Sequence, residues 1–86
     1  MRGKCAVVIG GTGELCGAMA EGLAGAGAYV YLVGRNKDKA ESRLEEIRKI
    51  DGQGEFIPCD VSQKEELEKL RDQVLEKHPS IDVLVN

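Results

Sequence analysis

The sequence is poor in aromatic residues, histidine and cysteine. Its 86 residues contain no tryptophan, one phenylalanine, two tyrosines, one histidine and three cysteines. The cysteines are odd in number and form no C-x-x-C pair, so they indicate neither a disulfide framework nor a zinc site. Cys5, Cys16 and Cys59 lie in or beside apolar runs, and we expect them to be buried small hydrophobic side chains. No His, Cys or carboxylate forms a nucleophile–base pair or a metal set of credible spacing.

Long hydrophobic runs and blocks of like charge are also missing. The apolar stretches are strand-sized, and the first ten residues lack the apolar region and cleavage site of a signal peptide. The 12 Lys and Arg are interleaved with 15 Asp and Glu, and the net charge is -3, so no basic stripe suggests nucleic acid. We therefore expect a cytoplasmic protein that binds neither nucleic acid nor a membrane.

What the sequence does contain is an alternation of strand-like and helix-like segments. Residues 4–9 and 29–33 are β-branched and aromatic runs bounded by glycine, which is typical of strands covered on both faces. Residues 55–61 form a short strand-like run with Pro58 near its end, and residues 81–86 form another run of the buried type. These four segments are the predicted strands.

The segments between the predicted strands have helical spacing. In the first, small and apolar residues recur every three or four positions and predict a narrow apolar face, formed by Leu15, Ala18, Met19, Gly22, Leu23 and Ala26. In the second, residues 36–50, one stripe consists of Ala40, Leu44 and Ile47.

A third helix is predicted after the third strand. Ser62 followed by Glu65 is a capping-box signature at its start. Its inward residues are expected to be Leu67, Leu70 and Val74. His78 and Pro79 have the pattern of a plain helix terminus.

The resulting order, β-α-β-α-β-α-β, predicts an α/β fold. Strands that alternate with helices of ten to fifteen residues imply right-handed crossovers and a parallel sheet. A chain of this length forms one domain and buries roughly 60 to 65% of its unfolded surface. We expect half of a doubly wound, Rossmann-like domain with strand order 3-2-1-4.

A glycine-rich loop follows the first predicted strand and opens a helix, as phosphate-binding loops do. Three registers compete: Gly11-x-Gly13-x-x-x-Gly17, Gly10-x-x-x-Glu14-x-Cys16, and Gly10-x-x-Gly13-x-x-Cys16. The second would place the Glu14 carboxylate against a pyrophosphate. We prefer the third, in which Cys16 is the small residue at the helix–strand contact and Gly17 lies beside it. A tight turn without a ligand is the alternative interpretation.

Together, these motifs resemble the N-terminal half of a short-chain dehydrogenase/reductase. Residues 7–36 resemble the first βαβ unit of that family without a gap, "CDVS" at 59–62 resembles its acidic turn, and "IDVLVN" at 81–86 resembles the strand leading into its Asn-Asn-Ala-Gly motif. The loop is also similar to those of sugar-acid oxidoreductases, such as mannonate or fructuronate reductases. A deazaflavin-dependent NADP reductase has a similar loop, but residues 60–86 read like the short-chain family throughout.

Charge after the second strand distinguishes the two nicotinamide cofactors. An acidic residue there accepts the ribose hydroxyls of NAD, whereas an arginine accommodates the 2′-phosphate of NADP. This chain has Gly34 and Arg35 at that point, which favours NADP, and Lys37 or Lys39 could assist. The alternative for Arg35 is a solvated start to the next helix.

The resemblance implies further cofactor contacts. Asp60 would bond the adenine amino group, Val61 would pack on the ring, and Asn86 would begin the segment along the ribose. Asp60 could instead be a turn or cap residue. The complete predicted cofactor-binding set is Gly10, Gly11, Thr12, Gly13, Glu14, Leu15, Arg35, Asn36, Asp60, Val61 and Asn86.

Catalytic residues are absent from the prediction. The family's Tyr, Lys and Ser lie beyond the fourth strand, and Tyr29 and Tyr31 have no lysine four residues on. We therefore expect residues 1–86 to be the cofactor-binding portion of an oxidoreductase, truncated before its catalytic part. A stand-alone nucleotide-binding module and an inert folding unit are the alternatives. The unpaired fourth strand also predicts a homo-oligomer through that edge.

Overall fold

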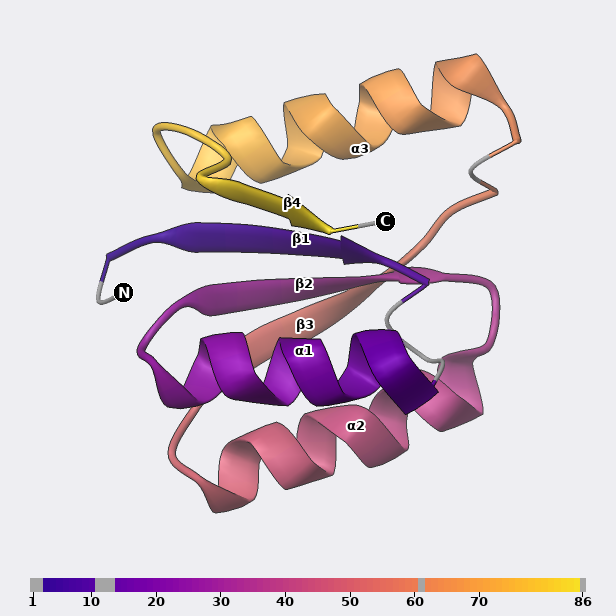
Figure 1. Ribbon diagram of the computed structural model, residues 1–86. Helices are drawn as coiled ribbons and strands as arrows, with labels where there is room; N and C mark the ends of the chain where they lie inside the picture. Colours follow the sequence, from indigo (N-terminus) through magenta and orange to yellow (C-terminus); the bar gives the residue numbers. More distant parts are fainter. Residues whose placement is uncertain (1–2, 11–13, 61, 86) are drawn as a thin grey trace.

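The computed structural model describes residues 3–10, 14–60 and 62–85 (Figure 1). Strands and helices alternate in it as the sequence predicts. They are β1 (Cys5–Ile9), α1 (Glu14–Gly25), β2 (Tyr29–Gly34), α2 (Lys37–Lys49), β3 (Gln53–Pro58), α3 (Lys64–Lys77) and β4 (Val83–Val85). The strands form one sheet in the order β3-β2-β1-β4, and every pairing is parallel. The predicted fold class and strand order are confirmed.

Strand register aligns the carboxyl ends of all four strands at one edge of the sheet, which we call the carboxyl edge. β1 pairs with β2 from Cys5↔Tyr29 to Ile9↔Val33. β2 pairs with β3 as far as Gly34↔Pro58, so the ends of these three strands are level. β4 pairs with β1 over three residues only, and it is the outer strand on its side.

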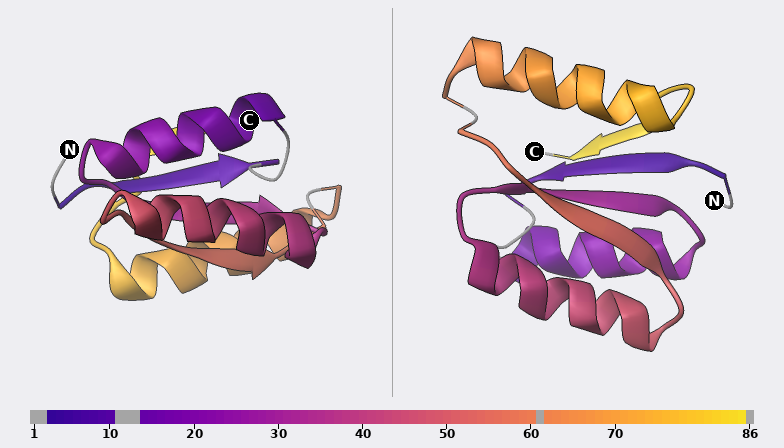
Figure 2. Two further views of the ribbon diagram at one scale, coloured as in Figure 1. Left: turned by 90° about the horizontal axis from the view of Figure 1, so that it is seen from below. Right: turned by 180° about the vertical axis from the view of Figure 1, so that it is seen from behind.

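Two helices cover one face of the sheet and one helix covers the other (Figure 2). α1 and α2 lie together on the first face, above a core of Ala6, Val8, Ala20, Ala24, Ala28, Val30, Leu32, Leu44 and Ile47. α3 lies on the second face, above a core of Cys5, Val7, Tyr31, Val33, Ile57, Cys59, Leu70 and Val74. Successive strand residues alternate between the two cores because side chains in a strand have a period of two.

The predicted inner face of α1 is correct at Leu23, which packs against the core, and wrong at other positions. Ala20 and Ala24 are the buried alanines of this helix, whereas Ala18 and Gly22 are exposed and Met19 is 44% exposed. Small residues occur around the whole helix, so spacing alone does not distinguish its faces. The inner faces of α2 and α3 are as predicted, with Leu67 only partly buried.

The predicted capping box of α3 is also wrong. The residue at the N-cap is Gln63, and its side chain makes no capping bond. The Ser62 hydroxyl instead donates to the Asp60 carboxylate, over 2.6 Å. An ionised acceptor gives the stronger bond, and this takes the hydroxyl away from the helix end.

The fourth strand is shorter and more exposed than its apolar sequence predicts. Leu84 is 65% exposed, and Val83 and Val85 are only partly buried. The reason is its position: within the described residues, β4 has a neighbouring strand on one side alone. The interpretation of residues 81–86 as a buried-type strand is therefore corrected to an edge strand.

Candidate functional site

The end of β1 turns sharply at Gly10 on the carboxyl edge. Gly10 has φ 75°, a left-handed conformation that favours glycine. Its N–H donates to the carbonyl of Val33 over 2.8 Å, which ties this turn to the end of β2. A Cβ at Gly10 would have no heavy atom within 4 Å, so bare backbone faces open space here. This is the surface that close approach of a phosphate requires.

The helix that follows begins at the same edge. α1 starts at Glu14, so its N-terminus, with its partial positive charge, lies beside the turn. The predicted residues Gly11, Thr12 and Gly13 lie outside the described residues, as do the side chains of Glu14, Leu15 and Cys16. The preferred glycine register, with Cys16 at the helix–strand contact, therefore stays a prediction.

The end of β2 brings Arg35 and Asn36 to the carboxyl edge. The Asn36 carboxamide oxygen accepts from the N–H of Lys39 over 3.1 Å and caps α2. This bond gives Asn36 a structural role at the helix start. Arg35 is exposed at the point where the chain leaves the sheet, and its charge therefore faces solvent and any ligand at this edge.

Asp60 lies at the end of β3 and forms a tight turn with Ser62. Its Oδ1 accepts from the hydroxyl of Ser62 and from its backbone N–H, the latter over 3.0 Å. These hydrogen bonds lower the pKa of Asp60, and the positive charge of Arg35 lowers it further. Asp60 therefore takes part in a turn, and its contact with the cofactor stays a prediction. The N–H of Cys59 donates to the carbonyl of Gly34 over 3.0 Å, so Arg35 and Asp60 follow residues that are bonded to each other at the carboxyl edge. Val61 and Asn86 lie outside the described residues.

The two described cysteine side chains are buried, as predicted. Cys5 and Cys59 are free thiols, 1% and 4% exposed. Burial raises the pKa of Cys59, and the nearby carboxylates of Glu66 and Asp60 raise it further. A raised pKa keeps this thiol protonated at neutral pH, which makes it a poor nucleophile.

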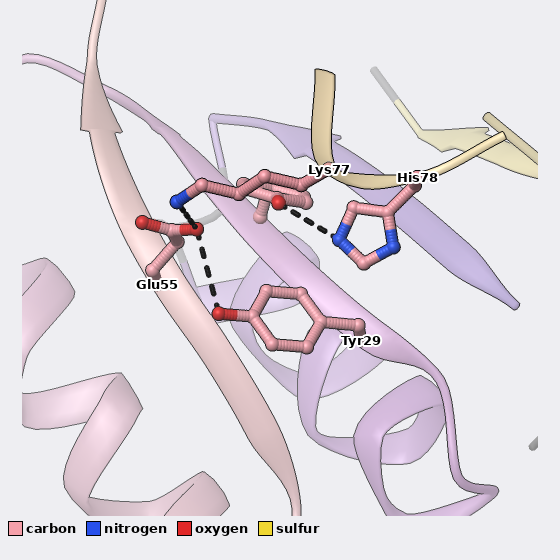
Figure 3. A network of polar contacts seen from close by, with 5 residues as sticks. Tyr29, Glu55, Lys77 and His78 are labelled. Atoms are coloured by element: carbon pink, nitrogen blue, oxygen red, sulfur yellow. Dashed lines mark hydrogen bonds and ion pairs between the residues drawn. The ribbon is translucent and has the colours of Figure 1, made fainter. Parts of the chain in front are cut away.

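Sequence reasoning missed a polar and aromatic cluster on the α3 face. His78 caps the end of α3, and its Nε2 lies 2.8 Å from the hydroxyl of Tyr31. Nearby, the carboxylate of Glu55 accepts from the hydroxyl of Tyr29 and from the ammonium of Lys77 (Figure 3). The alternation of Tyr29 and Tyr31 on one strand face was the available signal. The pairing with His78 depends on where α3 ends.

This cluster does not have the chemistry of a catalytic tyrosine. Burial raises the pKa of Tyr31, and the charge of Glu55 raises it further, so the hydroxyl keeps its proton. Lys77 contacts the Glu55 carboxylate. A tyrosine acting as a general acid beside a lysine would need the opposite effect on its pKa.

Other kinds of site are not found in the part of the chain that the structure describes. Residues 3–10, 14–60 and 62–85 contain no group of three or more His, Cys, Asp or Glu that could hold a metal ion. Within the same ranges, no helix combines the length and apolar character needed to cross a membrane.

Comparison with known proteins gives consistent matches over the whole chain. The model of the short chain dehydrogenase family matches residues 4–86. An uncharacterized oxidoreductase, UxuB, of Bacillus subtilis (strain 168) is 34% identical over 86 residues, which cover 100% of this chain and 31% of the relative.

Two solved structures with a bound dinucleotide are also similar. A metagenomic short-chain oxidoreductase in complex with NADP has a TM-score of 0.94 and 32% identity, over 98% of this chain and 38% of that one. NAD+-bound xylitol dehydrogenase has a TM-score of 0.89 and 28% identity, over 96% of this chain and 32% of that one. The chain thus spans about a third of the length of these relatives.

Proposed function

Because the chain belongs to the short-chain dehydrogenase family, we propose that it binds a nicotinamide dinucleotide at the carboxyl edge of its sheet. The observation that carries the proposal is the bare turn at Gly10, where a Cβ would point into open space beside the start of α1. The pyrophosphate would lie there, held by Gly10, Gly11, Thr12 and Gly13 and by the backbone N–H groups of Glu14 and Leu15 in the first turn of α1.

The dinucleotide that we propose is NADP. Arg35 is exposed at the end of β2 and follows Gly34, so no carboxylate at position 34 repels a 2′-phosphate. A guanidinium can hold a phosphate through two parallel hydrogen bonds. Asn36 would lie beside the 2′-phosphate, Asp60 and Val61 would hold the adenine, and Asn86 would line the ribose. The NADP complex of a similar oxidoreductase supports this choice, whereas the NAD+ complex of xylitol dehydrogenase makes NAD the competitor.

Titration calorimetry with NADPH and NADH tests the cofactor and its discrimination. We expect tighter binding of NADPH, and we expect Arg35→Asp to weaken NADPH by about tenfold or more, since a charged hydrogen bond is worth roughly 1.5–3 kcal/mol. Arg48→Asp is the matched control, because Arg48 is exposed and lies in the last turn of α2, at the opposite end of that helix from Arg35. Tighter NADH binding by the unmodified chain would overturn the NADP proposal, and no binding of either would favour the inert folding unit.

A second test addresses the loop. Gly13→Val should abolish dinucleotide binding and leave the circular dichroism spectrum unchanged, because its side chain would block the pyrophosphate. Loss of the folded spectrum would instead show that Gly13 has a structural role.

The chemistry that we propose for the full-length protein is hydride transfer between NADP and an alcohol or carbonyl substrate. The family supports this reaction class. The chain spans about a third of its relatives, and within the described residues no tyrosine, lysine and serine come together as catalytic groups. Residues 1–86 would therefore supply the cofactor-binding portion. A Tyr-x-x-x-Lys encoded downstream in the source gene would distinguish this from a stand-alone nucleotide-binding module.

We also propose a homo-oligomer formed through β4. Leu84 points to the α3 face, where it and its neighbours line an open apolar hollow of about 300 Å³. The lining residues are Val7, Ile9, Leu67, Leu70, Arg71, Ile81 and Leu84. An exposed apolar edge strand is a template for pairing with a second strand. Two copies of β4 paired about a two-fold axis at Leu84 would place both leucines side by side.

Sedimentation at several protein concentrations tests the oligomer. Leu84→Lys should shift the population toward monomer. It is a cleaner variant than Val83→Lys, because Val83 packs against the core under α1 and α2. Leu75→Lys is the control, since Leu75 is 42% exposed on α3 and lies outside the residues that line the hollow. A monomer at every concentration would contradict the proposal.

A further inference from the structure

Gly17 lies in the first turns of α1, is buried, and faces the Arg43 side chain of α2. A Cβ at this position would collide with Nε of Arg43, and it would lie 2.7 Å from Cζ and 3.0 Å from Cδ of the same side chain. Such separations are too short for a real side chain. The Arg43 guanidinium of α2 therefore crosses α1 at a backbone position that has no side chain.

An ion pair of the same guanidinium group also holds Arg43 in this position. Its Nη1 lies 3.8 Å from Oε1 of Glu21, four residues after Gly17 and hence on the same face of α1. The two side chains are 27% and 30% exposed, so the pair is partly shielded from solvent. Arg43 thus spans one turn of α1 and connects α1 to α2.

The contact between Arg43 and Gly17 lies near the carboxyl edge of the sheet. α1 and α2 run side by side in the same direction, and both begin at that edge (Figure 1). Arg43 meets α1 in the fourth helical residue, close to its start. The proposed pyrophosphate site is at the start of α1, and the proposed 2′-phosphate site is at Arg35, just before α2. The distance between the two sites therefore depends on how closely the two helix starts pack.

We propose that Gly17 and Arg43 are positioning residues for the dinucleotide. Gly17 leaves room for the Arg43 guanidinium, and Arg43 sets the spacing of α1 and α2 so that both phosphate-binding positions match one ligand. The proposal rests on the dinucleotide function inferred above. Helix stability does not explain a glycine at position 17, because glycine in a helix interior is unfavourable relative to alanine.

A double-mutant cycle tests the proposal, with NADPH affinity measured by calorimetry and stability measured by urea unfolding. Gly17→Ala should lower the affinity for NADPH about fivefold, because the added methyl group displaces Arg43. The same substitution should not lower the urea midpoint of unfolding. Arg43→Ala should lower the affinity for NADPH by a similar factor. In the Arg43→Ala background, Gly17→Ala should cause no further loss of affinity. Gly22→Ala is the matched control, since Gly22 is exposed on α1 and a Cβ there meets nothing within 4 Å.

The outcomes are distinguishable. Additive losses of affinity in the cycle, or a Gly17→Ala variant that binds NADPH like the unmodified chain, would overturn the positioning role. A loss of stability that follows the loss of affinity in every variant would also overturn it, because that pattern is expected of a purely structural residue. Failure of the unmodified chain to bind NADPH or NADH would instead refute the proposed function on which the inference rests.

Discussion

Two helices cover one face of the sheet, whereas α3 alone covers the other (Figure 2). The buried residues of the core beneath α1 and α2 are alanine, valine, leucine and isoleucine, and the partly buried Phe56 packs against them. The core beneath α3 contains Cys5, Cys59 and Tyr31, and polar groups of Tyr29, Glu55, Lys77 and His78 lie beside it. An open apolar hollow also remains between α3 and β4.

The two faces therefore hold their helices in different ways. The aliphatic face packs α1 and α2 against the sheet, and the starts of these two helices carry the proposed phosphate-binding positions. The α3 face is closed by fewer apolar side chains, and directional hydrogen bonds hold the end of α3 on the sheet. The comparison predicts that equal changes on the two faces have unequal effects.

The largest effect is expected from Ile47→Ala. Ile47 is fully buried under α2, and its removal leaves a cavity that close-packed neighbours cannot fill. We expect the free energy of unfolding to fall by about 4 kcal/mol. Urea unfolding followed by circular dichroism measures the loss. A loss below about 2 kcal/mol would show that this face is not tightly packed.

Leu70→Ala makes a comparable deletion on the α3 face and should have a smaller effect. Leu70 is 6% exposed and lines the apolar hollow, so less packing surrounds it and solvent can enter the space. We expect a loss of about 2 kcal/mol in the same unfolding experiment. A loss equal to or greater than that of Ile47→Ala would contradict the comparison of the two faces.

Tyr31→Phe tests the directional contribution to the α3 face. The ring stays buried, but the hydroxyl that bonds His78 over 2.8 Å is removed. We expect the free energy of unfolding to fall by about 1 kcal/mol, the usual net value of one hydrogen bond. Tyr29→Phe is the control, because its bond to Glu55 is longer, at 3.4 Å, and should contribute less. Equal losses for both variants would show that the bond between Tyr31 and His78 makes no particular contribution to stability.

The smallest effect is expected from Asp82→Asn, and it should depend on pH. Asp82 joins β4 to β1: its Oδ2 accepts from the N–H of Cys5, and its own N–H donates to the carbonyl of Cys5, both over 2.9 Å. The bond from Cys5 lowers the pKa of Asp82 below its ordinary value, and Ser80 and Lys4 add to this effect.

A lowered pKa fixes the sign of the pH dependence. The carboxylate of Asp82 stabilises the folded chain above about pH 4, where it is ionised in both states, and this contribution is lost as the pH falls through the lower folded-state value. The stability difference between the unmodified chain and Asp82→Asn should therefore be greatest near neutral pH and shrink below about pH 4. Thermal unfolding between acidic and neutral pH measures it. A difference independent of pH would exclude a role for the charge.

Much of this architecture could be predicted from local sequence. Continuous β-branched and aromatic runs in β1 and β2 predict strands buried on both faces, and Ala40, Leu44 and Ile47 have the spacing that buries one face of α2. The positions of Gly10 and Arg35 after two parallel strands predict that both lie at one edge. These conclusions follow from periodicities of 2 and 3.6 residues, which adjacent residues impose on one another.

Other features were decided by the tertiary structure. The small residues of α1 allow several inner faces, and its packing against the sheet and α2 selects Ala20, Ala24 and Gly17. The hydroxyl of Ser62 bonds the Asp60 carboxylate and does not cap α3. His78 bonds the hydroxyl of Tyr31, which is 47 residues away in the chain. In each case, several residues could occupy the same space or bond the same polar group. The distances between helices and strands in the assembled fold decide which of them does so.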